Sequence, residues 1–179
     1  MAQSPYCQRV VLDRQPTLVG QLVKLRPLQT PDFGALYAIA SDPLMWEQHP
    51  SKDRTQQPVF RKWFDRALAS GGALVATDHH GQTIGTSRFD HYDPEASEVE
   101  IGWTFLARSY WGGTYNGEVK RLMLSHAFGA VETVVFRVHS RNLRSQRAVE
   151  KLGAIRTGVE IDPDGRGENV IFRLSAPAG

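Results

Sequence analysis

The segment from Trp103 to His126 constrains the fold most, because it joins an apolar strand to an amphipathic helix through a glycine-containing turn. Before the turn, Ile101, Trp103 and Phe105 alternate with smaller residues, as in a strand. The first N–H groups of the following helix have no internal partner, and its dipole adds about half a positive charge. The turn therefore predicts a site for an anion such as a phosphate. The apolar face of the helix follows a 3.6-residue period: Val119, Leu122, Met123, His126 and Ala127.

A second strand, turn and helix follow directly in the sequence. The apolar strand Val134–Val138 precedes Asn142, a residue type that caps helices, and the helical pattern stops at Gly153. In the first turn, Gly112 and Gly113 would let a ligand approach the backbone closely. One glycine turn before a helix is a weak signal, but two such units in succession favour a ligand site between them.

The remaining pattern predicts one domain with strands before and between helices. Residues 1–17 are expected to form an extended leader, and residues 18–179 the folded domain. The order of elements indicates an α+β or mixed α/β fold built on a single sheet. The expected strands cover residues 19–28, 73–77, 83–90, 98–106, 155–161 and 169–174, and the other helices cover residues 30–41 and 58–70, separated by a loop at 42–55.

Composition excludes several classes of protein. The chain has 179 residues, 41% hydrophobic and 22% charged, as in a soluble globular domain. Its net charge of +2 is too small to indicate a nucleic-acid partner. Cys7 is the only cysteine, so no internal disulfide or thiolate cluster can form, and the histidines show no metal-ligand spacing. We find no signal peptide and no membrane-length apolar run, which makes the cytoplasm the expected compartment.

Two motifs in these units resemble those of the GNAT superfamily of acetyl-CoA-dependent N-acetyltransferases, and in particular its RimJ/RimL branch. Residues 110–115, YWGGTY, with Glu118, match the branch's Tyr-Trp-Gly-x-Gly-Tyr pattern and its following Glu, although Thr114 replaces the second glycine. Asn142, Ser145 and residues 150–153, EKLG, match a second, more specific pattern. The resemblance covers residues 18–174 and implies a twisted, mostly antiparallel sheet flanked by helices.

The resemblance also implies a cosubstrate and a reaction. The chain would move acetyl directly from acetyl-CoA to a primary amine, on a protein N-terminus or a small molecule. No metal would be needed. Arg108, Arg144 and Arg147 would surround the coenzyme phosphates if both turns converge, although a solvated surface is the commoner place for arginine. The residues implied to bind the cosubstrate are Phe105, Leu106, Arg108, Trp111, Gly112, Gly113, Thr114, Tyr115, Asn142 and Ser145.

Glu100 is the favoured general base, because it lies on the strand that leads into the cofactor turn, where the family often carries a glutamate acting through water. It could equally be a carboxylate on the polar face of that strand. Glu98 shares the face and is the reserve candidate, whereas His91 and Asp93 are assigned to the preceding turn. Deprotonating an α-amine at pH 7 costs about 1.4 kcal/mol, against about 4.6 kcal/mol for a lysine.

Two further roles have weaker candidates. Gly102 is a plausible bulge residue, which would splay the strand and free the backbone groups of Phe105 and Leu106 for the pantetheine amides. Many relatives protonate the leaving thiolate with a tyrosine, but the corresponding residue here is Val149, which leaves Ser145 as the candidate acid. Ser145 could instead only help to cap the helix, and Asn142 could hold the pantetheine arm as well as cap.

The sequence leaves other functions open. A GNAT-like domain that binds coenzyme A without catalysis, as a sensor or interaction module, is the main alternative, and a generic nucleotide-binding module is a weaker one. Trp46 and His49 could border the acceptor pocket, because long loops often carry function. The acceptor amine and the formation of a homodimer cannot be read from the sequence.

Overall fold

A computed structural model describes residues 10–163 and 165–177, which form one eight-stranded sheet and four α-helices. The strand order is β1-β2-β3-β4-β5-β6-β8-β7, and every neighbouring pair is antiparallel except β5 and β6. The predicted fold class is therefore confirmed. The strands are β1 (Leu18–Val19), β2 (Val23–Pro27), β3 (Ala73–Asp78), β4 (Thr83–Asp93), β5 (Glu98–Leu106), β6 (Thr133–His139), β7 (Ile155–Ile161) and β8 (Glu168–Ser175); the helices are α1 (Phe33–Ala40), α2 (Gln57–Ala69), α3 (Thr114–Ala127) and α4 (Leu143–Glu150).

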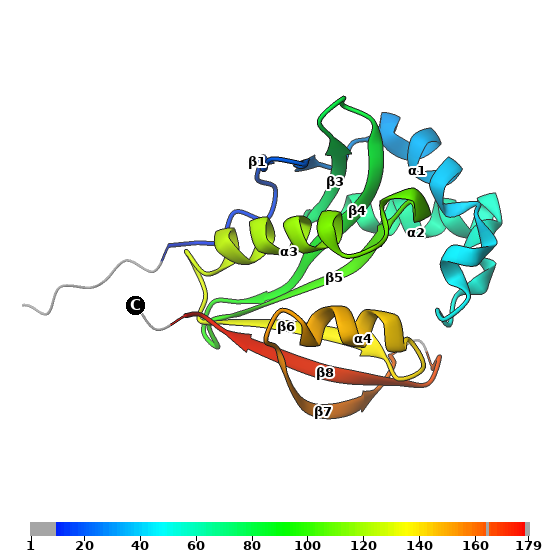
Figure 1. Cartoon of the computed structure of the whole chain (residues 1–179). Helices are drawn as coiled ribbons and strands as arrows, with labels where there is room; N and C mark the ends of the chain where they lie inside the picture. Colours follow the sequence, from blue (N-terminus) through cyan, green and yellow to red (C-terminus); the bar gives the residue numbers. More distant parts are fainter. Residues whose placement is uncertain (1–9, 164, 178–179) are drawn as a thin grey trace, which may run out of the picture.

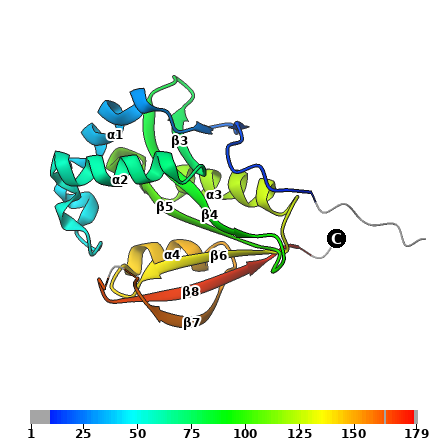
Figure 2. The same ribbon diagram turned by 180° about the vertical axis from the view of Figure 1, so that it is seen from behind.

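Helices cover both faces of the sheet, α3 and α4 on one and α1 and α2 on the other (Figures 1 and 2). Each face has its own apolar core. Val119, Met123 and Val149 of α3 and α4 pack against Ile101 and Phe136 of the sheet. On the other face, residues of α1 and α2 pack with aromatic side chains of the sheet and loop: Leu36, Phe60, Phe64, Trp46 and Phe105. The sheet is therefore buried on both sides.

Besides shifts of one to three residues at several ends, the elements differ from the sequence prediction as follows. The single strand expected at residues 19–28 is two short strands, because a turn at Gly20–Gln21 separates β1 from β2. The expected loop at 42–55 contains two short 3-10 helices, Pro43–Trp46 and Lys52–Thr55. His91 and Asp93 belong to β4, whereas the sequence assigned them to a turn.

The β5 and β6 strands form a fork. They pair only where Glu98–Glu100 lie beside Thr133–Val135, and beyond this point they separate. A bulge accompanies the separation, since the register between β4 and β5 shifts after Thr86 and Trp103 has a positive φ of 51°. The bulge predicted at Gly102 thus lies one residue further on, and Gly102 itself pairs with Arg88.

Part of the predicted leader packs on the domain. Leu12 is buried in the core on the α3 side, and its N–H donates to the Tyr92 hydroxyl at 3.3 Å. Residues 1–9 of the leader, including Cys7, lie outside the described residues. Within the described ranges, no helix combines the length and apolar character needed to cross a membrane.

Candidate active site

A cleft of about 1480 Å³ opens where β5 and β6 separate. Its walls are the fork itself, the start of α3, helix α4 and the loop between α1 and α2. Pockets for one small ligand usually measure about 300–1,000 Å³, so this cleft has room for two ligands side by side. Both predicted strand–turn–helix units open into it.

The turn before α3 has the geometry of an anion site. Gly112 and Gly113 adopt φ of 109° and 102°, which residues with a side chain rarely tolerate, and a Cβ added to either would meet nothing within 4 Å. Gly113 is the N-cap of α3, and no side chain caps the helix there. The first turn of α3 also carries no acidic residue. The first N–H groups of α3 therefore have no intrahelical partner, and Gly112 and Gly113 line the cleft beside them.

Leu106 and Trp111 lie together beside this turn. The Trp111 indole donates to the Leu106 carbonyl at 2.8 Å, and the Arg144 guanidinium lies 3.9 Å from the indole ring centroid. The N–H of Ala107 donates to Ile84 on β4, and pairs alternate along an antiparallel ladder. The backbone groups of Phe105 therefore face β4, and those of Leu106 face the fork.

The side chains of Arg108, Thr114 and Tyr115 do not line the cleft. Arg108 forms an ion pair with Asp42 after α1, which directs its side chain away from the turn. The rings of Tyr115 and Tyr110 pack edge to face, with their centroids 4.9 Å apart. Of these three predicted cosubstrate residues, Thr114 and Tyr115 can still offer backbone N–H groups in the first turn of α3.

The second unit places Asn142 and Ser145 in the cleft wall. Asn142 is buried, and its Oδ1 accepts from the Ser145 N–H at 3.2 Å, which caps α4. Arg144, Arg147 and Lys151 also line the cleft from α4 and its end. Together with Arg121 of α3, these side chains make this wall positively charged.

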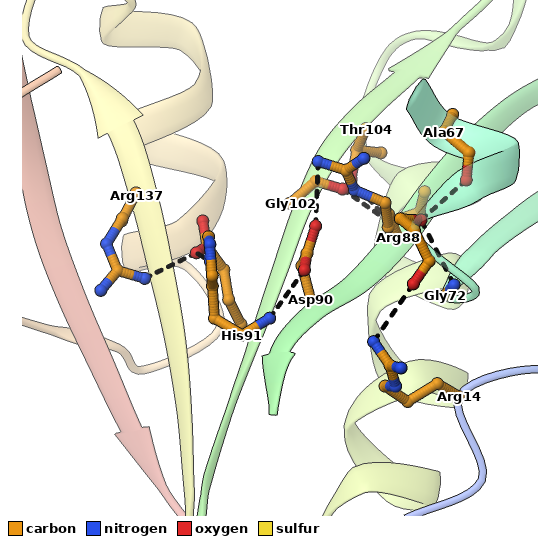
Figure 3. Close-up of polar contacts among 12 residues, drawn as sticks. Arg14, Ala67, Gly72, Arg88, Asp90, His91, Gly102, Thr104 and Arg137 are labelled. Carbon is orange, nitrogen blue, oxygen red and sulfur yellow. Dashed lines mark hydrogen bonds and ion pairs between the residues drawn. The ribbon is translucent and has the colours of Figure 1, made fainter. Parts of the chain in front are cut away.

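Glu100 lies at the point where the fork closes, and it is only 3% exposed. Its Oε2 accepts a hydrogen bond from Arg137 Nη1 at 2.6 Å and lies 2.7 Å from His91 Nδ1. Figure 3 shows Arg137 and His91 pointing toward each other from β6 and β4. His91 is largely exposed and lines the cleft, so its second ring nitrogen is available there. The Glu100 carboxylate is thus held between Arg137 and His91 at the closed end of the fork.

Glu98, the reserve base, lies elsewhere. Its carboxylate is paired with Arg173 of β8, and it is not among the residues that line the cleft. The structure therefore separates the two glutamates that the sequence left as alternatives, and it brings only Glu100 together with the predicted cosubstrate residues.

The loop between α1 and α2 forms the wall on the Glu100 side. Trp46 is buried, with its ring centroid 5.6 Å from that of Phe105. The rings of His49 and Trp46 pack edge to face. Burial, and then the charges of Arg54 and other nearby cations, lower the pKa of His49 to about 3. His49 is therefore neutral at physiological pH. Both residues line the cleft, where the sequence had suggested an acceptor pocket.

Sequence reasoning missed three residues of this site: His91, Arg137 and Lys120. His91 has a positive φ of 45° beside an irregularity of the β4–β5 ladder, and simple strand alternation does not show where it points. Lys120 offered a signal, because it lies on the stripe of α3 that includes Gly113 and Leu124, at helical spacing. The described residues contain no group of three or more His, Cys, Asp or Glu placed to hold a metal ion.

Residues 23–155 match the family model described as "Acetyltransferase (GNAT) domain", and the chain belongs to this family. Membership of this family supports acetyltransferase activity with acetyl-CoA as the acetyl donor. It does not favour a domain that binds coenzyme A without catalysis.

Solved structures agree with this family. A candidate acetyltransferase from T. thermophilus is 30% identical, with a TM-score of 0.73, and the match covers 89% of this chain and 88% of that one. A probable acetyltransferase from Chromobacterium violaceum ATCC 12472 gives a TM-score of 0.80 at 20% identity, over 98% and 95% of the two chains. Mycobacterium smegmatis RimJ, solved with CoA-disulfide, gives 0.73 at 19% identity, over 93% and 90%.

Proposed function

We propose that this protein transfers acetyl directly from acetyl-CoA to a primary amine, in the manner of the RimJ/RimL branch, with a protein N-terminus or a small molecule as acceptor. The observation that carries the proposal is the shared cleft. It joins the open glycine turn at Gly112–Gly113, the buried carboxylate of Glu100 and the α4 residues Asn142 and Ser145. Two substrates that must react with each other need such a common space.

In this proposal the coenzyme enters on the α3–α4 side. Its pyrophosphate binds the free N–H groups at the start of α3, which Gly112 and Gly113 leave accessible, and the neighbouring cations neutralise phosphate charge. The pantetheine arm lies along the fork. It takes the place of the missing neighbouring strand and pairs with the backbone groups of Leu106. Asn142 and Ser145 border the arm from α4. The thioester then reaches the closed end of the fork.

The acceptor amine approaches from the side of Glu100 and His91. An amine must be neutral to attack, and the Glu100–His91 pair can take its proton, either on the free Oε1 or on the exposed ring nitrogen of His91. Arg137 keeps the Glu100 carboxylate in place. The nitrogen then bonds to the thioester carbonyl carbon, and the C–S bond breaks to release coenzyme A.

Two measurements test this function. Calorimetric titration with acetyl-CoA should show binding, whereas ATP at the same concentration should not bind comparably. Thiol release should then be followed with a panel of amines: a peptide with a free N-terminus, the same peptide with a blocked N-terminus and one lysine, a polyamine and an amino sugar. Binding of acetyl-CoA without thiol release from any amine would support the non-catalytic alternative.

A further inference from the structure

Lys120 is a buried amine in the wall of the cleft. It projects from the stripe of α3 that faces the fork, between Gly117 and Leu124, and it is only 6% exposed. Its Nζ donates to Thr104 Oγ1 at 2.6 Å and lies 3.4 Å from Ser87 Oγ. In the described part of the chain, Lys120 forms no ion pair.

The surroundings of Lys120 give no structural reason for a lysine. The hydroxyls of Ser87 and Thr104 hydrogen-bond to each other at 2.7 Å, so neither needs the ammonium as a partner. Burying a cation without a counter-charge costs free energy, and an apolar side chain of similar length would avoid that cost. A site that retains such a group is a candidate for chemistry.

Among residues 10–163 and 165–177, no acidic side chain forms an ion pair with Lys120 to compensate for this burial. Arg121 follows on α3, and Glu118 of the same helix binds backbone N–H groups near β2. Alternation along β4, β5 and β6 directs Arg88, Glu100 and Arg137 to the opposite face of the sheet, because their neighbours Phe89, Ile101 and Phe136 belong to the core on the α3 side. Burial alone lowers the pKa of Lys120, to about 7.

The ammonium lies inside the fork. Thr104 belongs to the bulge of β5, and the Phe136 ring, whose centroid is 5.8 Å from Nζ, belongs to β6. Nζ therefore lies between the two strands, just beyond the point where their pairing ends at Glu100. In the proposed function, this is where the thioester must lie, with Glu100 and His91 on one face of the sheet and Lys120 on the other.

We propose that Lys120 donates the proton that the coenzyme A sulfur takes up when the C–S bond breaks. The inference rests on the proposed acetyl transfer. The acceptor nitrogen bonds to the carbonyl carbon and loses a proton to the Glu100–His91 pair. The electron pair of the C–S bond goes to sulfur, which takes a proton from the Lys120 ammonium. The neutral Lys120 amine then regains a proton from solvent, and the Glu100–His91 pair loses its proton to solvent.

Burial makes this transfer favourable. An alkyl thiol has a pKa near 8.5, so an ammonium with a pKa near 7 gives its proton to a thiolate downhill, whereas an ordinary lysine near 10.4 would give it uphill. A serine hydroxyl can relay a proton but is a much weaker acid. Ser145 in the same cleft is then a neighbour of the sulfur, and Lys120 is the source of the proton.

The first test needs no acceptor. Bound coenzyme A is titrated, with the ultraviolet absorbance of its thiolate as the readout, in the wild type and in Lys120→Met. Around pH 7, where Lys120 is still partly protonated, the ammonium stabilises a neighbouring thiolate, so a larger fraction of the bound thiol should be ionised in the wild type than in the variant. Identical titrations in the two proteins would overturn the proposal. Lys62→Met, at an exposed position on α2 away from the cleft, is the matched control and should behave as wild type.

The second test uses turnover. An acid must be protonated to act, so wild-type kcat should fall as the pH rises through the pKa of Lys120. Lys120→Met should lose at least ~10-fold in kcat at neutral pH and should lack this fall, with the acetyl-CoA dissociation constant changed by less than ~3-fold. Ser145→Ala should lose less kcat than Lys120→Met. A purely structural lysine would leave the shape of the pH profile unchanged, and that outcome would refute the proposal.

These tests separate the inference from the proposed function. If coenzyme A does not bind at all, both the proposed function and the inference fail. If it binds and amines are acetylated, but Lys120→Met keeps the wild-type thiol titration and pH profile, only the inference fails.

Discussion

Glu100 and Lys120 are both buried ionisable groups at the same fork, but their environments are opposite. Glu100 has a counter-charge in Arg137 and a second partner in His91, while Lys120 has two hydroxyls, Thr104 and Ser87, and no ion pair among the described residues. A carboxylate with two hydrogen-bond partners is held in a fixed orientation. An unpartnered amine is easily neutralised. The fork therefore places an oriented carboxylate on one face and a buried amine without an ion pair on the other, and the proposed transfer uses both groups.

The largest expected effect is on the Glu100 side. Glu100→Gln cannot take a proton and weakens the attachment of Arg137, so turnover at pH 7 should fall by about 10²-fold or more. The deficit should shrink as pH rises toward the pKa of the acceptor, near 8 for an α-amine and near 10 for a lysine. Steady-state kinetics across pH measures this.

Two variants sharpen that result. Glu98→Gln makes the same chemical change on the same strand but outside the cleft, and it should lower turnover much less. His91→Gln should match the loss in Glu100→Gln if the exposed ring nitrogen takes the proton, and it should lose little if Glu100 takes it directly. Full turnover in Glu100→Gln at pH 7 would mean that this carboxylate only orders the strand.

On the other face, stability should change in the opposite direction to activity. Lys120→Met removes an unpaired buried amine, and we expect it to raise the free energy of unfolding by about 2 kcal/mol at pH 6, roughly half of what the full pKa difference implies at about 1.4 kcal/mol per unit. The unfolded chain binds the lysine proton up to pH near 10.4, so wild-type stability should rise between pH 7 and that value.

The advantage of Lys120→Met should therefore be fully present below pH 7 and should shrink toward pH 10. Urea unfolding of the two proteins at several pH values measures it. An equal difference at all pH values would show that packing, rather than the charge of Lys120, separates the two proteins.

A smaller effect is expected at the phosphate turn. Gly112→Val places a side chain at a φ of 109° and in the space proposed for the pyrophosphate, so the acetyl-CoA dissociation constant should rise at least ~10-fold. Gly34→Val, at an open position of α1, is the control for the loss of a glycine and should bind normally. Calorimetry gives both constants, and an unchanged value in Gly112→Val would remove this turn from the site.

The smallest expected change concerns the cap of α4. Asn142→Ala loses the hydrogen bond to the Ser145 N–H, at a cost of up to ~1 kcal/mol in stability, and it should also weaken acetyl-CoA binding. Asn142→Ser can still cap α4, but its shorter side chain cannot reach as far toward the proposed pantetheine arm. It should restore stability in thermal unfolding without restoring affinity. If it restores both, Asn142 serves the helix alone.

Local chemistry explains what the sequence could predict. The β5 strand has the predicted bounds, and the turn at Gly112–Gly113 and the cap at Asn142 depend only on residues within one or two turns of the chain. Glycine at positive φ and asparagine at a helix start have physical reasons that can be read from residue type. These features were enough to indicate the fold and one wall of the site.

Contacts between distant residues were not predictable in this way. The ion pair of Arg108 with Asp42 joins residues 66 apart, and that of Arg137 with Glu100 joins residues 37 apart. Strand alternation put Glu98 and Glu100 on the same face, but it could not show which of the two lines the cleft. Within the described structure, Lys120 has no ion pair because none of the elements packed around it brings an acidic side chain close. That depends on the tertiary packing, which the sequence does not show.

Glu118, one turn into α3, has a consequence for hydrogen exchange. Its carboxylate accepts from the N–H groups of Gln21, Leu22 and Val23, and a Cβ on Gly20 would lie 2.8 Å from its Cδ. These three amides lie at the β1 edge of the sheet, where amide protons normally exchange quickly with solvent. Here their exchange should be slow, and it should follow the opening of the helix that begins at the glycine turn.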